Sequence, residues 1–154
     1  MNDQAARIAT LNAEYARAID DDRLEAWPDF FVEECLYRIT TADNHAQGLQ
    51  AGMIWCDTRD MIRDRVVSLR KANVYERQRY RHIVGQSAVL PSQVALKTET
   101  PFLVVRIMRD GKTDLFATGR YLDEVVEEDG VLKFRERTVV CDSSRIDTLL
   151  AIPL

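Results

Sequence analysis

Residues 101–142, which read PFLVVRIMRDGKTDLFATGRYLDEVVEEDGVLKFRERTVVCD, carry the strongest structural signal in this chain. Apolar and polar side chains alternate along them, with many β-branched and aromatic residues, as in strands that have one buried face. Two pairs, Asp110-Gly111 and Asp129-Gly130, interrupt the alternation. Asp-Gly favours the type I′ hairpin turn, in which both central residues have positive φ. The sequence therefore predicts an antiparallel meander of strands over 101–109, 112–126 and 131–142.

Helical periodicity precedes this meander. Ile8, Leu11 and Tyr15 recur three and four residues apart, which predicts an amphipathic first helix. A shorter helical stretch is predicted over 24–31, and a third helix after Asp57. A strand at 35–39 lies between the helices, and two more strands are predicted near 79–86 and 93–100. Helices followed by a run of strands indicate an α+β fold, with helices packed on one face of an antiparallel sheet.

Length and charge limit the possible classes of protein. The chain has 154 residues, which is close to the roughly 150 residues of one domain, so we expect a single domain over 1–154. Lys and Arg number 21 against 25 Asp and Glu, for a formal net charge of −4. An acidic balance gives no general attraction to polyanions, so we expect no binding to nucleic acid or to anionic membranes.

The cysteines point to a reducing compartment. Cys35, Cys56 and Cys141 lie far apart and form no C-x-x-C pair, so neither a disulfide framework nor a zinc site is predicted. The first residues lack the basic and apolar regions of a secretory signal, and the longest apolar runs are far too short to span a bilayer. We therefore expect a cytoplasmic protein.

The sequence contains few residues that could bind a metal or a nucleotide. The only two histidines, His45 and His82, are predicted in a loop and in a strand, whereas a mononuclear iron triad needs two histidines and a carboxylate that converge. A Rieske cluster needs two cysteines and two histidines, and no closely spaced Cys/His pair occurs. No glycine-rich nucleotide motif and no G-x-S-x-G elbow is present. We predict no catalytic, cofactor-binding or metal-binding residue in this chain.

An arginine-rich strand is the first candidate site. Arg77, Arg79 and Arg81 alternate with other residues, so in a strand they share one face, while Tyr80 and His82 share the other. The arginines form either a solvated or locally paired basic face, or an anchor surface for an acidic partner protein. His82 is either a hydrogen-bonded interior histidine or a catalyst.

The last strand carries a carboxylate on an apolar face. Strict alternation places Arg135 and Arg137 on one side and Glu136 with Phe134 on the other. A carboxylate there must be paired or must have a raised pKa. We predict a structural ion pair between Glu136 and Arg120 of the neighbouring strand; the alternative is a general base.

The apolar segment 149–154 at the end of the sequence is a second candidate contact. Terminal segments fray unless something covers them. This segment, which includes Leu154, either docks on its own core or is buried against another subunit. We include Leu154 among the predicted interface residues.

A set of motifs spreads over nearly the whole chain. It includes Asp20-Asp21, Leu24, Trp27, Phe31, Tyr37, Asp64-Arg65-Val66, Leu69, Arg79-Tyr80-Arg81-His82, Val105-Arg106, Asp110-Gly111, Phe116, Gly119-Arg120-Tyr121, Asp129-Gly130 and Arg135-Glu136-Arg137. Together these motifs resemble the small (β) subunit of bacterial aromatic-ring-hydroxylating dioxygenases. Further residues resemble the branch of that family whose enzymes act on an aromatic dicarboxylate, among them Asp43-Asn44-His45, Thr100-Pro101-Phe102 and Cys141-Asp142-Ser143.

The resemblance implies a fold, a partner and a reaction. The fold is a cone of nuclear-transport-factor-2 or ketosteroid-isomerase type (cystatin-like), with N-terminal helices against a curved antiparallel sheet. The assembly is an α3β3 hexamer of large α subunits and β subunits. The α subunit holds a Rieske [2Fe-2S] cluster and a mononuclear Fe(II), and a separate reductase relays electrons from NADH for cis-dihydroxylation. The β subunit itself is a scaffold, and Arg77, Arg79 and Arg81 then belong to a subunit interface rather than to a substrate pocket.

Two alternative functions use the same fold, because one fold hosts many activities. One is a stand-alone isomerase or dehydratase that uses His82 or an acidic residue inside the cone. The other is a binding module for a small ligand. Both predict an open cavity around Tyr37, Tyr80 and His82, whereas a scaffold predicts an interior filled by side chains.

Overall fold

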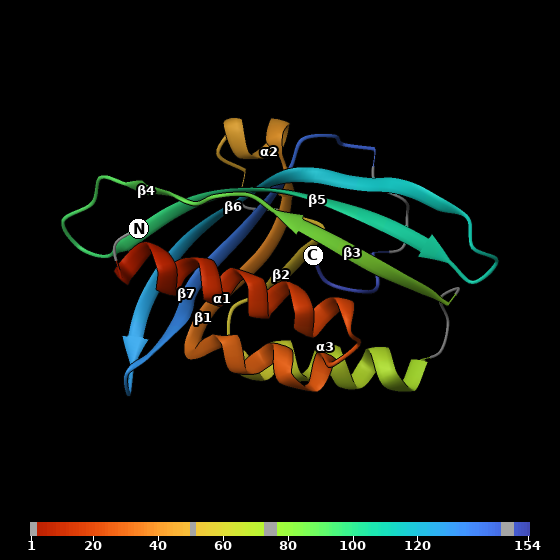
Figure 1. The fold of residues 1–154 in the computed structure, drawn as a ribbon, viewed down its shortest axis with the longest axis horizontal. Coiled ribbons are helices and arrows are strands. Elements are labelled where there is room, and N and C mark those ends of the chain that lie inside the picture. The colour runs from red at the N-terminus through yellow and green to blue at the C-terminus, as the bar shows by residue number, and fades with distance from the viewer. Residues whose placement is uncertain (1–2, 50–51, 73–76, 146–149) are drawn as a thin grey trace.

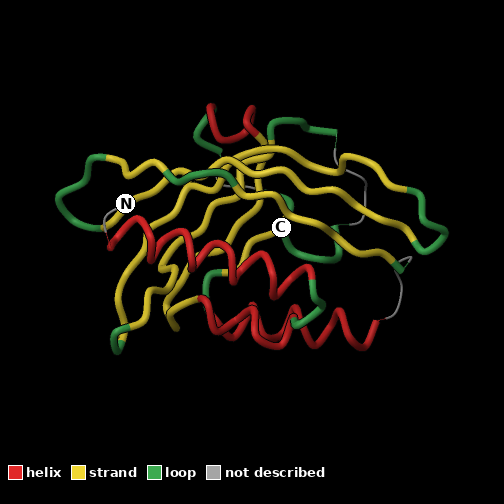
Figure 2. Tube along the Cα trace, in the orientation of Figure 1, coloured by secondary structure: helices red, strands yellow, loops and turns green. Residues whose placement is uncertain are grey.

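The computed structural model describes residues 3–49, 52–72, 77–145 and 150–154, and its centre is a curved sheet with helices on its concave side (Figure 1). The elements are α1 (Asp3–Asp20), the 3-10 helix η1 (Leu24–Phe30), β1 (Phe31–Thr41), α2 (Ala42–Ala46), β2 (Ile54–Cys56), α3 (Arg59–Ala72), β3 (Gln78–Val84), β4 (Ala88–Leu90), β5 (Leu96–Met108), β6 (Thr113–Glu128) and β7 (Val131–Cys141). Helices α1 and α3 lie on one side of the sheet and the short α2 lies on the other (Figure 2).

The sheet is mixed. Its strand order is β2-β1-β7-β6-β5-β3, and β4 also pairs with β5. Strands β5, β6 and β7 form the predicted antiparallel meander. The prediction of a wholly antiparallel sheet is wrong in one place, because β1 runs parallel to β7, with Tyr37 opposite Arg137 and Ile39 opposite Val139. This pairing joins segments about 100 residues apart, and local periodicity carries no signal for such a contact.

The two Asp-Gly turns differ. Asp129 and Gly130 have φ of 53° and 79°, so the type I′ turn between β6 and β7 is confirmed. Gly111 has φ of 92°, but Asp110 is not among the described residues with positive φ. The Gly111 N–H donates to the Met108 oxygen at 2.9 Å, which makes a three-residue loop with glycine at its left-handed position. The type I′ prediction for 110–111 is therefore wrong.

Strand β5 is one continuous strand, although we predict two strands that meet at Pro101. The Pro101 oxygen accepts from the Gly85 N–H at 2.8 Å, so the proline nitrogen also points towards that side of β5. The neighbouring strands on that side are β3, which ends at Val84, and β4, which begins at Ala88. Pro101 thus faces the gap between two partner strands, where its missing N–H breaks no ladder bond.

A β-bulge reverses the alternation in β7. Val125 of β6 pairs with Phe134, and the preceding Glu124 pairs with Glu136, so Arg135 is an extra residue on β7. Phe134 and Arg137 therefore both face the interior, while Arg135 is exposed. The prediction that Arg135 and Arg137 share a face is wrong for this reason, since a one-residue shift moves every later side chain to the other face.

The interior contains a cluster of aromatic side chains from α1, η1, β1 and β7. Tyr15 lies edge-on to Phe31 and Phe134, and Trp27 lies edge-on to Phe31 and Tyr37. Pairs of this geometry each contribute about 0.5–1.5 kcal/mol beyond the burial of their surface. The cluster joins the helices to the parallel strand pair and fixes the shape of the cone.

Candidate functional site

The interior of the cone is closed. Tyr37, Tyr80 and His82, the residues around which a substrate cavity would open, are 0%, 2% and 6% exposed. Trp27 and Phe31 beside them are fully buried. The side chains thus fill the space that a stand-alone enzyme or ligand-binding module would need to keep open.

Residues 150–154 close the mouth of the cone. The Tyr15 and Tyr37 hydroxyls donate to the backbone oxygen of Leu154 at 2.9 and 2.8 Å. The Leu154 N–H in turn donates to the Tyr37 hydroxyl at 3.2 Å, and the Tyr80 hydroxyl donates to the Ile152 oxygen at 3.3 Å. Leu154 is 0% exposed. It therefore docks on the core of its own chain, and the prediction that it lies at a subunit interface is corrected: a side chain already covered has no surface left to offer.

Burial keeps the phenols of this interior protonated. It raises the pKa of Tyr15, although Arg137 opposes the shift, and it raises the pKa of Tyr37 and of Tyr121 well above the ordinary value of 10.0. A phenolate out of water loses its hydration, which disfavours the charged form. These hydroxyls are therefore hydrogen-bond donors over the physiological pH range.

A buried pair of Asp20 and His82 joins α1 to β3. His82 Nδ1 lies 2.6 Å from Asp20 Oδ1, and the His82 backbone N–H donates to Asp20 Oδ2 at 2.8 Å. Strand β3 is at the edge of the sheet, so Asp20 satisfies an edge N–H as well as the ring. His82 Nε2 is buried without a hydrogen-bond partner in the described structure. His82 is an interior histidine, as the first of the two interpretations predicts.

A second buried charge pair lies deeper. Arg137 is 0% exposed and donates to both oxygens of Asp123 at 2.8 Å, and also to the Asn12 side chain. Its guanidinium lies 4.4 Å from the ring centroid of Tyr15 and 3.9 Å from that of Tyr121. Burial raises the pKa of Asp123, and Arg137 opposes that shift. Sequence reasoning missed this pair, because the bulge that brings Arg137 inside leaves no periodic signal.

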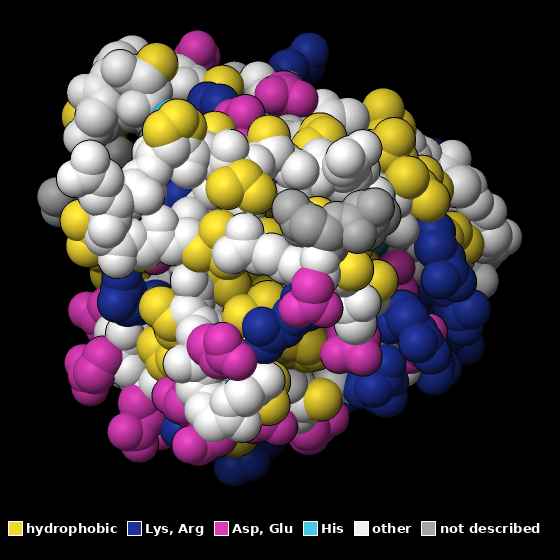
Figure 3. Space-filling model, turned by 60° about the vertical axis from the view of Figure 1, so that its left-hand side comes forward, with side chains coloured by type: hydrophobic (Ala, Val, Ile, Leu, Met, Phe, Trp, Pro, Cys, Tyr) yellow, Lys and Arg dark blue, Asp and Glu magenta, His cyan; other side chains and the backbone are white. Residues whose placement is uncertain are grey.

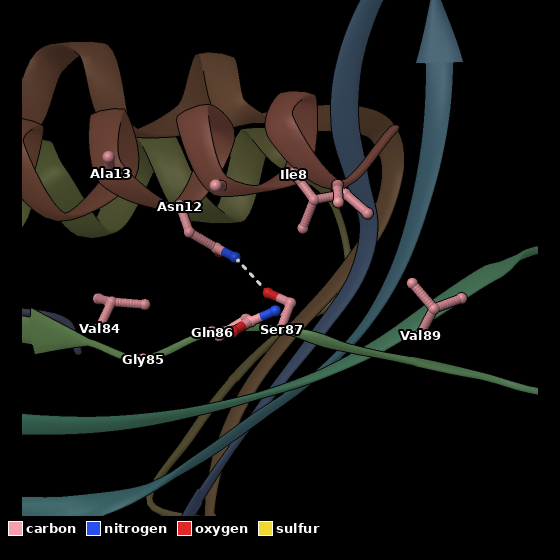
Figure 4. Close-up of a pocket in the computed structure, with 10 residues that line it drawn as sticks. Ile8, Asn12, Ala13, Val84, Gly85, Gln86, Ser87 and Val89 are labelled. Carbon is pink, nitrogen blue, oxygen red and sulfur yellow. Dashed lines mark hydrogen bonds between the residues drawn. The ribbon is translucent and has the colours of Figure 1, made fainter. Parts of the chain in front are cut away.

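Two surface hollows lie away from this interior. One, of about 160 Å³, lies between α1 and the link from β3 to β4 (Figure 4), where the Asn12 amide donates to the Ser87 hydroxyl at 3.2 Å. The other, of about 320 Å³, is shallow and lies between α1 and the β6–β7 turn. Neither is lined by Tyr37, Tyr80 or His82.

The outer face of β3 is unlike its inner face. Arg77, just before the strand, and Arg79 and Arg81 within it are all exposed, while Tyr80 and His82 point inward, so the predicted alternation is confirmed. None of the three arginines makes an ion pair or side-chain hydrogen bond with a described residue. On the face drawn in Figure 3, Lys and Arg gather mainly on one side and Asp and Glu on the other.

An apolar strip borders these arginines. Across the strand pair, Arg79 lies opposite Ile107, Arg81 opposite Val105, and Ile83 opposite Leu103. Ile83 is 56% exposed, and Leu115, opposite Val105 on β6, is 63% exposed. We call this surface the outer β3 face. It combines exposed apolar area with arginines that have no partner in the described structure, which is the composition of protein interfaces.

The ion pair predicted between Arg120 and Glu136 is replaced by two others. Arg120 forms an ion pair with Glu99 of β5. Glu136 Oε1 lies 3.9 Å from Nη2 of Arg38, which is in β1. The β6–β7 register places Arg120 opposite Val140 and Glu136 opposite Glu124, so the two are not neighbours. The Glu136 side chain is 36% exposed, so the bulge also removes the apolar environment that suggested a general base.

Possible metal ligands do not converge in the described ranges. His45 lies in α2, on the outer side of the sheet, whereas His82 lies in β3 and its side chain points inward. Within 3–49, 52–72, 77–145 and 150–154, no three His, Cys, Asp or Glu side chains form a group that could hold a metal ion. Among the helices of the described residues, none is long and apolar enough to cross a bilayer.

Asp20, the partner of His82, is another interior residue that sequence reasoning missed. It lies in an acidic run, Asp20-Asp21-Asp22, which suggests the start of a second helix, whereas Asp20 is the last residue of α1. Its partner His82 is 62 residues away. The only signal was indirect: a histidine on an apolar strand face needs a hydrogen-bonding partner.

Comparisons with known proteins agree with this geometry. The family described as "Ring hydroxylating beta subunit" matches residues 14–148. The terephthalate 1,2-dioxygenase terminal oxygenase component subunit beta 1 of a Comamonas species is 50% identical over 149 residues, covering 96% of this chain and 97% of that protein. The anthranilate 1,2-dioxygenase small subunit of Burkholderia cepacia is 38% identical over 148 residues, covering 96% and 92%.

A solved structure gives the same answer for the fold. A Novosphingobium aromaticivorans protein, assigned as the β subunit of an aromatic-ring-hydroxylating dioxygenase, has a TM-score of 0.89 and 36% identity, and the match covers 98% of this chain and 97% of that one. The α+β cone expected from the resemblance is thereby confirmed. The chain belongs to the family of ring-hydroxylating dioxygenase β subunits.

Proposed function

We propose that this chain is a non-catalytic scaffold in the terminal oxygenase of a dioxygenase that cis-dihydroxylates an aromatic carboxylate, with terephthalate as the first substrate to test. The observation that carries the proposal is the closed interior: in a member of this family, the space around Tyr37, Tyr80 and His82 is filled by the chain's own residues. Terephthalate is favoured because the Comamonas relative is named as part of a terephthalate 1,2-dioxygenase.

The proposal places the redox chemistry in a partner. The Rieske [2Fe-2S] cluster and mononuclear Fe(II) belong to the α subunit, with electrons from NADH through a reductase, in a cytoplasmic complex. This chain, as one domain over 1–154, joins α subunits and other β subunits in an α3β3 hexamer. The outer β3 face is the proposed contact with the α subunit. Its arginines would pair with carboxylates there, because guanidinium groups bind carboxylates bidentately.

A dehydratase or isomerase is the second candidate, and one observation favours it. His82 is held by the Asp20 carboxylate, and its Nε2 has no hydrogen-bond partner among the residues that the structure describes, which is how a general base is oriented. The obstacle is access, since the His82 side chain is 0% exposed. This function would require residues 150–154 to leave the mouth of the cone.

Native mass spectrometry with metal analysis tests the proposal, on the chain alone and after co-expression with a candidate α subunit. We expect a chain that carries no iron and no activity alone, and that enters a hexamer that contains iron and, with the reductase added, consumes NADH in the presence of terephthalate. A chain that ignores the α subunit, or converts a small substrate alone, would overturn the scaffold assignment.

A further inference from the structure

Residues 150–154 are held through their backbone by side chains from four separate elements. Arg65 of α3 donates to the Leu150 oxygen at 2.8 Å, and Tyr80 of β3 donates to the Ile152 oxygen. Tyr15 of α1 and Tyr37 of β1 both donate to the Leu154 oxygen. The accepting oxygens belong to alternate residues, and the segment bends at Ile152 between the first and the last of them. The segment belongs to no helix or strand.

This mode of contact is that of a bound peptide. A segment of an ordinary core pairs with a neighbouring strand or continues a helix, and so satisfies its polar groups within regular structure. Here the polar groups are satisfied by side chains that converge from different elements, while Ile152 and Leu154 insert into the aromatic interior. Directional contacts to a backbone combined with apolar side chains in pockets are a common way in which proteins recognise short peptides.

The hydroxyls of this recess contact both polar backbone atoms of Leu154. Tyr37 donates to the Leu154 oxygen and accepts from the Leu154 N–H, so one phenol contacts both polar atoms of the same residue. Tyr15 gives the second donor to that oxygen while its own oxygen accepts from Trp27 Nε1 at 3.2 Å. Without an occupant, the Tyr37 hydroxyl would lose both of its contacts with Leu154 in a buried site, which is unfavourable. We call the recess formed by Tyr15, Trp27, Tyr37 and Tyr80 the tyrosine recess.

We propose that this tyrosine recess is a binding site for a short apolar peptide, and that residues 150–154 are its ligand within the same chain. The recess binds the backbone N–H and the backbone oxygen of Leu154 through Tyr37 and Tyr15, and it selects apolar side chains at 152 and 154. It follows that the recess binds the sequence Leu-Ala-Ile-Pro-Leu as a separate peptide when the segment is removed from the chain.

The direct test uses a chain that ends at residue 149 and the synthetic peptide Leu-Ala-Ile-Pro-Leu. Trp27 reports binding by its fluorescence, and a Trp55→Phe background removes the other tryptophan, which is 39% exposed. We expect saturable binding and a raised melting temperature. The peptide with alanine for its last leucine should bind at least about tenfold more weakly, because a buried leucine side chain is removed. A folded, truncated chain that shows no saturable binding would overturn the proposal.

A matched pair of variants separates recognition from general destabilisation. Tyr37→Phe removes a hydroxyl that contacts Leu154, whereas Tyr121→Phe removes a buried hydroxyl that has no partner in the described structure. We expect Tyr37→Phe to weaken peptide binding about tenfold and Tyr121→Phe to leave it unchanged. Equal effects of both variants would contradict recognition by the recess.

Hydrogen exchange on the full chain decides the case where the truncated chain does not refold. The amides of 152 and 154 should exchange at least about tenfold faster in Tyr37→Phe than in Tyr121→Phe, because only the first variant loosens the segment. If both variants protect these amides equally, residues 150–154 are ordinary core and the proposal fails.

Discussion

The two faces of strand β3 differ in how their polar groups are satisfied. On the inner face, His82 is bound by Asp20, and the Tyr80 hydroxyl donates to the Ile152 oxygen. On the outer face, Arg79 and Arg81 find no charged partner among the described residues. The inner face thus completes its contacts within one chain, whereas the outer face leaves strong donors exposed beside apolar area. In a family of subunits, this contrast supports the proposals that the inner face serves packing alone and that the outer face serves association.

Removal of Arg137 should have the largest effect on the stability of the inner region. Arg137→Met leaves the Asp123 carboxylate buried without its partner, which costs roughly 3–5 kcal/mol. We expect urea unfolding to show a loss of that size in the free energy of unfolding. As the outer control, Arg79→Met should change it by less than about 0.5 kcal/mol. Comparable losses for both variants would contradict the distinction between the two regions.

A second substitution should partly restore the free energy of unfolding that Arg137→Met loses. Adding Asp123→Asn removes the stranded charge, so the double variant should be more stable than Arg137→Met alone. A double variant that is less stable than either single variant would indicate that the charge itself is not what makes the pair costly to break.

High pH should weaken the inner region through its buried thiols and phenols. Burial raises the pKa of Cys141 from 9.0 to about 12, and that of Cys35 to about 11. A raised folded-state pKa gives stability that is complete below pH 9 and is lost as the pH rises towards the folded value. We expect Cys141 to account for a loss on the order of 2 kcal/mol between pH 8 and 11, so unfolding of Cys141→Ala should depend less steeply on pH. Parallel pH profiles for the two proteins would count against this origin.

Charge reversal on the outer β3 face should affect assembly and leave folding intact. Arg79→Glu combined with Arg81→Glu should weaken association with the α subunit at least about tenfold, roughly 1.4 kcal/mol, by placing like charges at the contact. Arg17→Glu combined with Arg63→Glu, at exposed positions on α1 and α3, is the control because it changes the net charge by the same amount. The Kd by analytical ultracentrifugation distinguishes them, and unaltered assembly in the β3 variant would move the interface elsewhere.

The smallest expected effect concerns iron. His82→Ala should leave the iron content of the assembled complex unchanged, because His82 is an interior residue that is bound to Asp20. Iron is measured by mass spectrometry and normalised to intact hexamer, so that a loss of stability is not mistaken for a loss of metal. Less iron per hexamer would show that this chain supplies a ligand after all.

Local signals predicted the elements, and errors came from contacts that the sequence does not repeat. The helices at 3–20 and 59–72 and the β6–β7 hairpin follow from apolar periodicity and an Asp-Gly pair. Pro101 looks like a strand boundary because proline usually interrupts a ladder, but it lies at a gap between partner strands. The polar link 41–51 hides the short helix α2, where the Thr41 side chain caps Asn44.

The candidate site was predictable only where alternation holds. The opposite orientations of Arg79 and Tyr80 follow from the two-residue period of a strand. The prediction of an Arg120–Glu136 pair failed because Arg135 is an extra residue in β7. The alternation of side chains along β7 is therefore shifted by one residue after this bulge. The position of Ile152 and Leu154 depends on three tyrosines from three elements, and no pattern in one sequence brings those tyrosines together.

The parallel pairing of β1 with β7 sets the order in which this chain can fold as it is synthesised. Arg38 bonds Thr138 across 100 residues, and Tyr37 meets Leu154 across 117. A nascent chain has made Trp27, Phe31 and Tyr37 long before the strand that covers them exists. Contacts between residues so far apart in the sequence form slowly, and apolar surface stays exposed until they form. During synthesis, these apolar side chains therefore stay uncovered until β7 and residues 150–154 have been made.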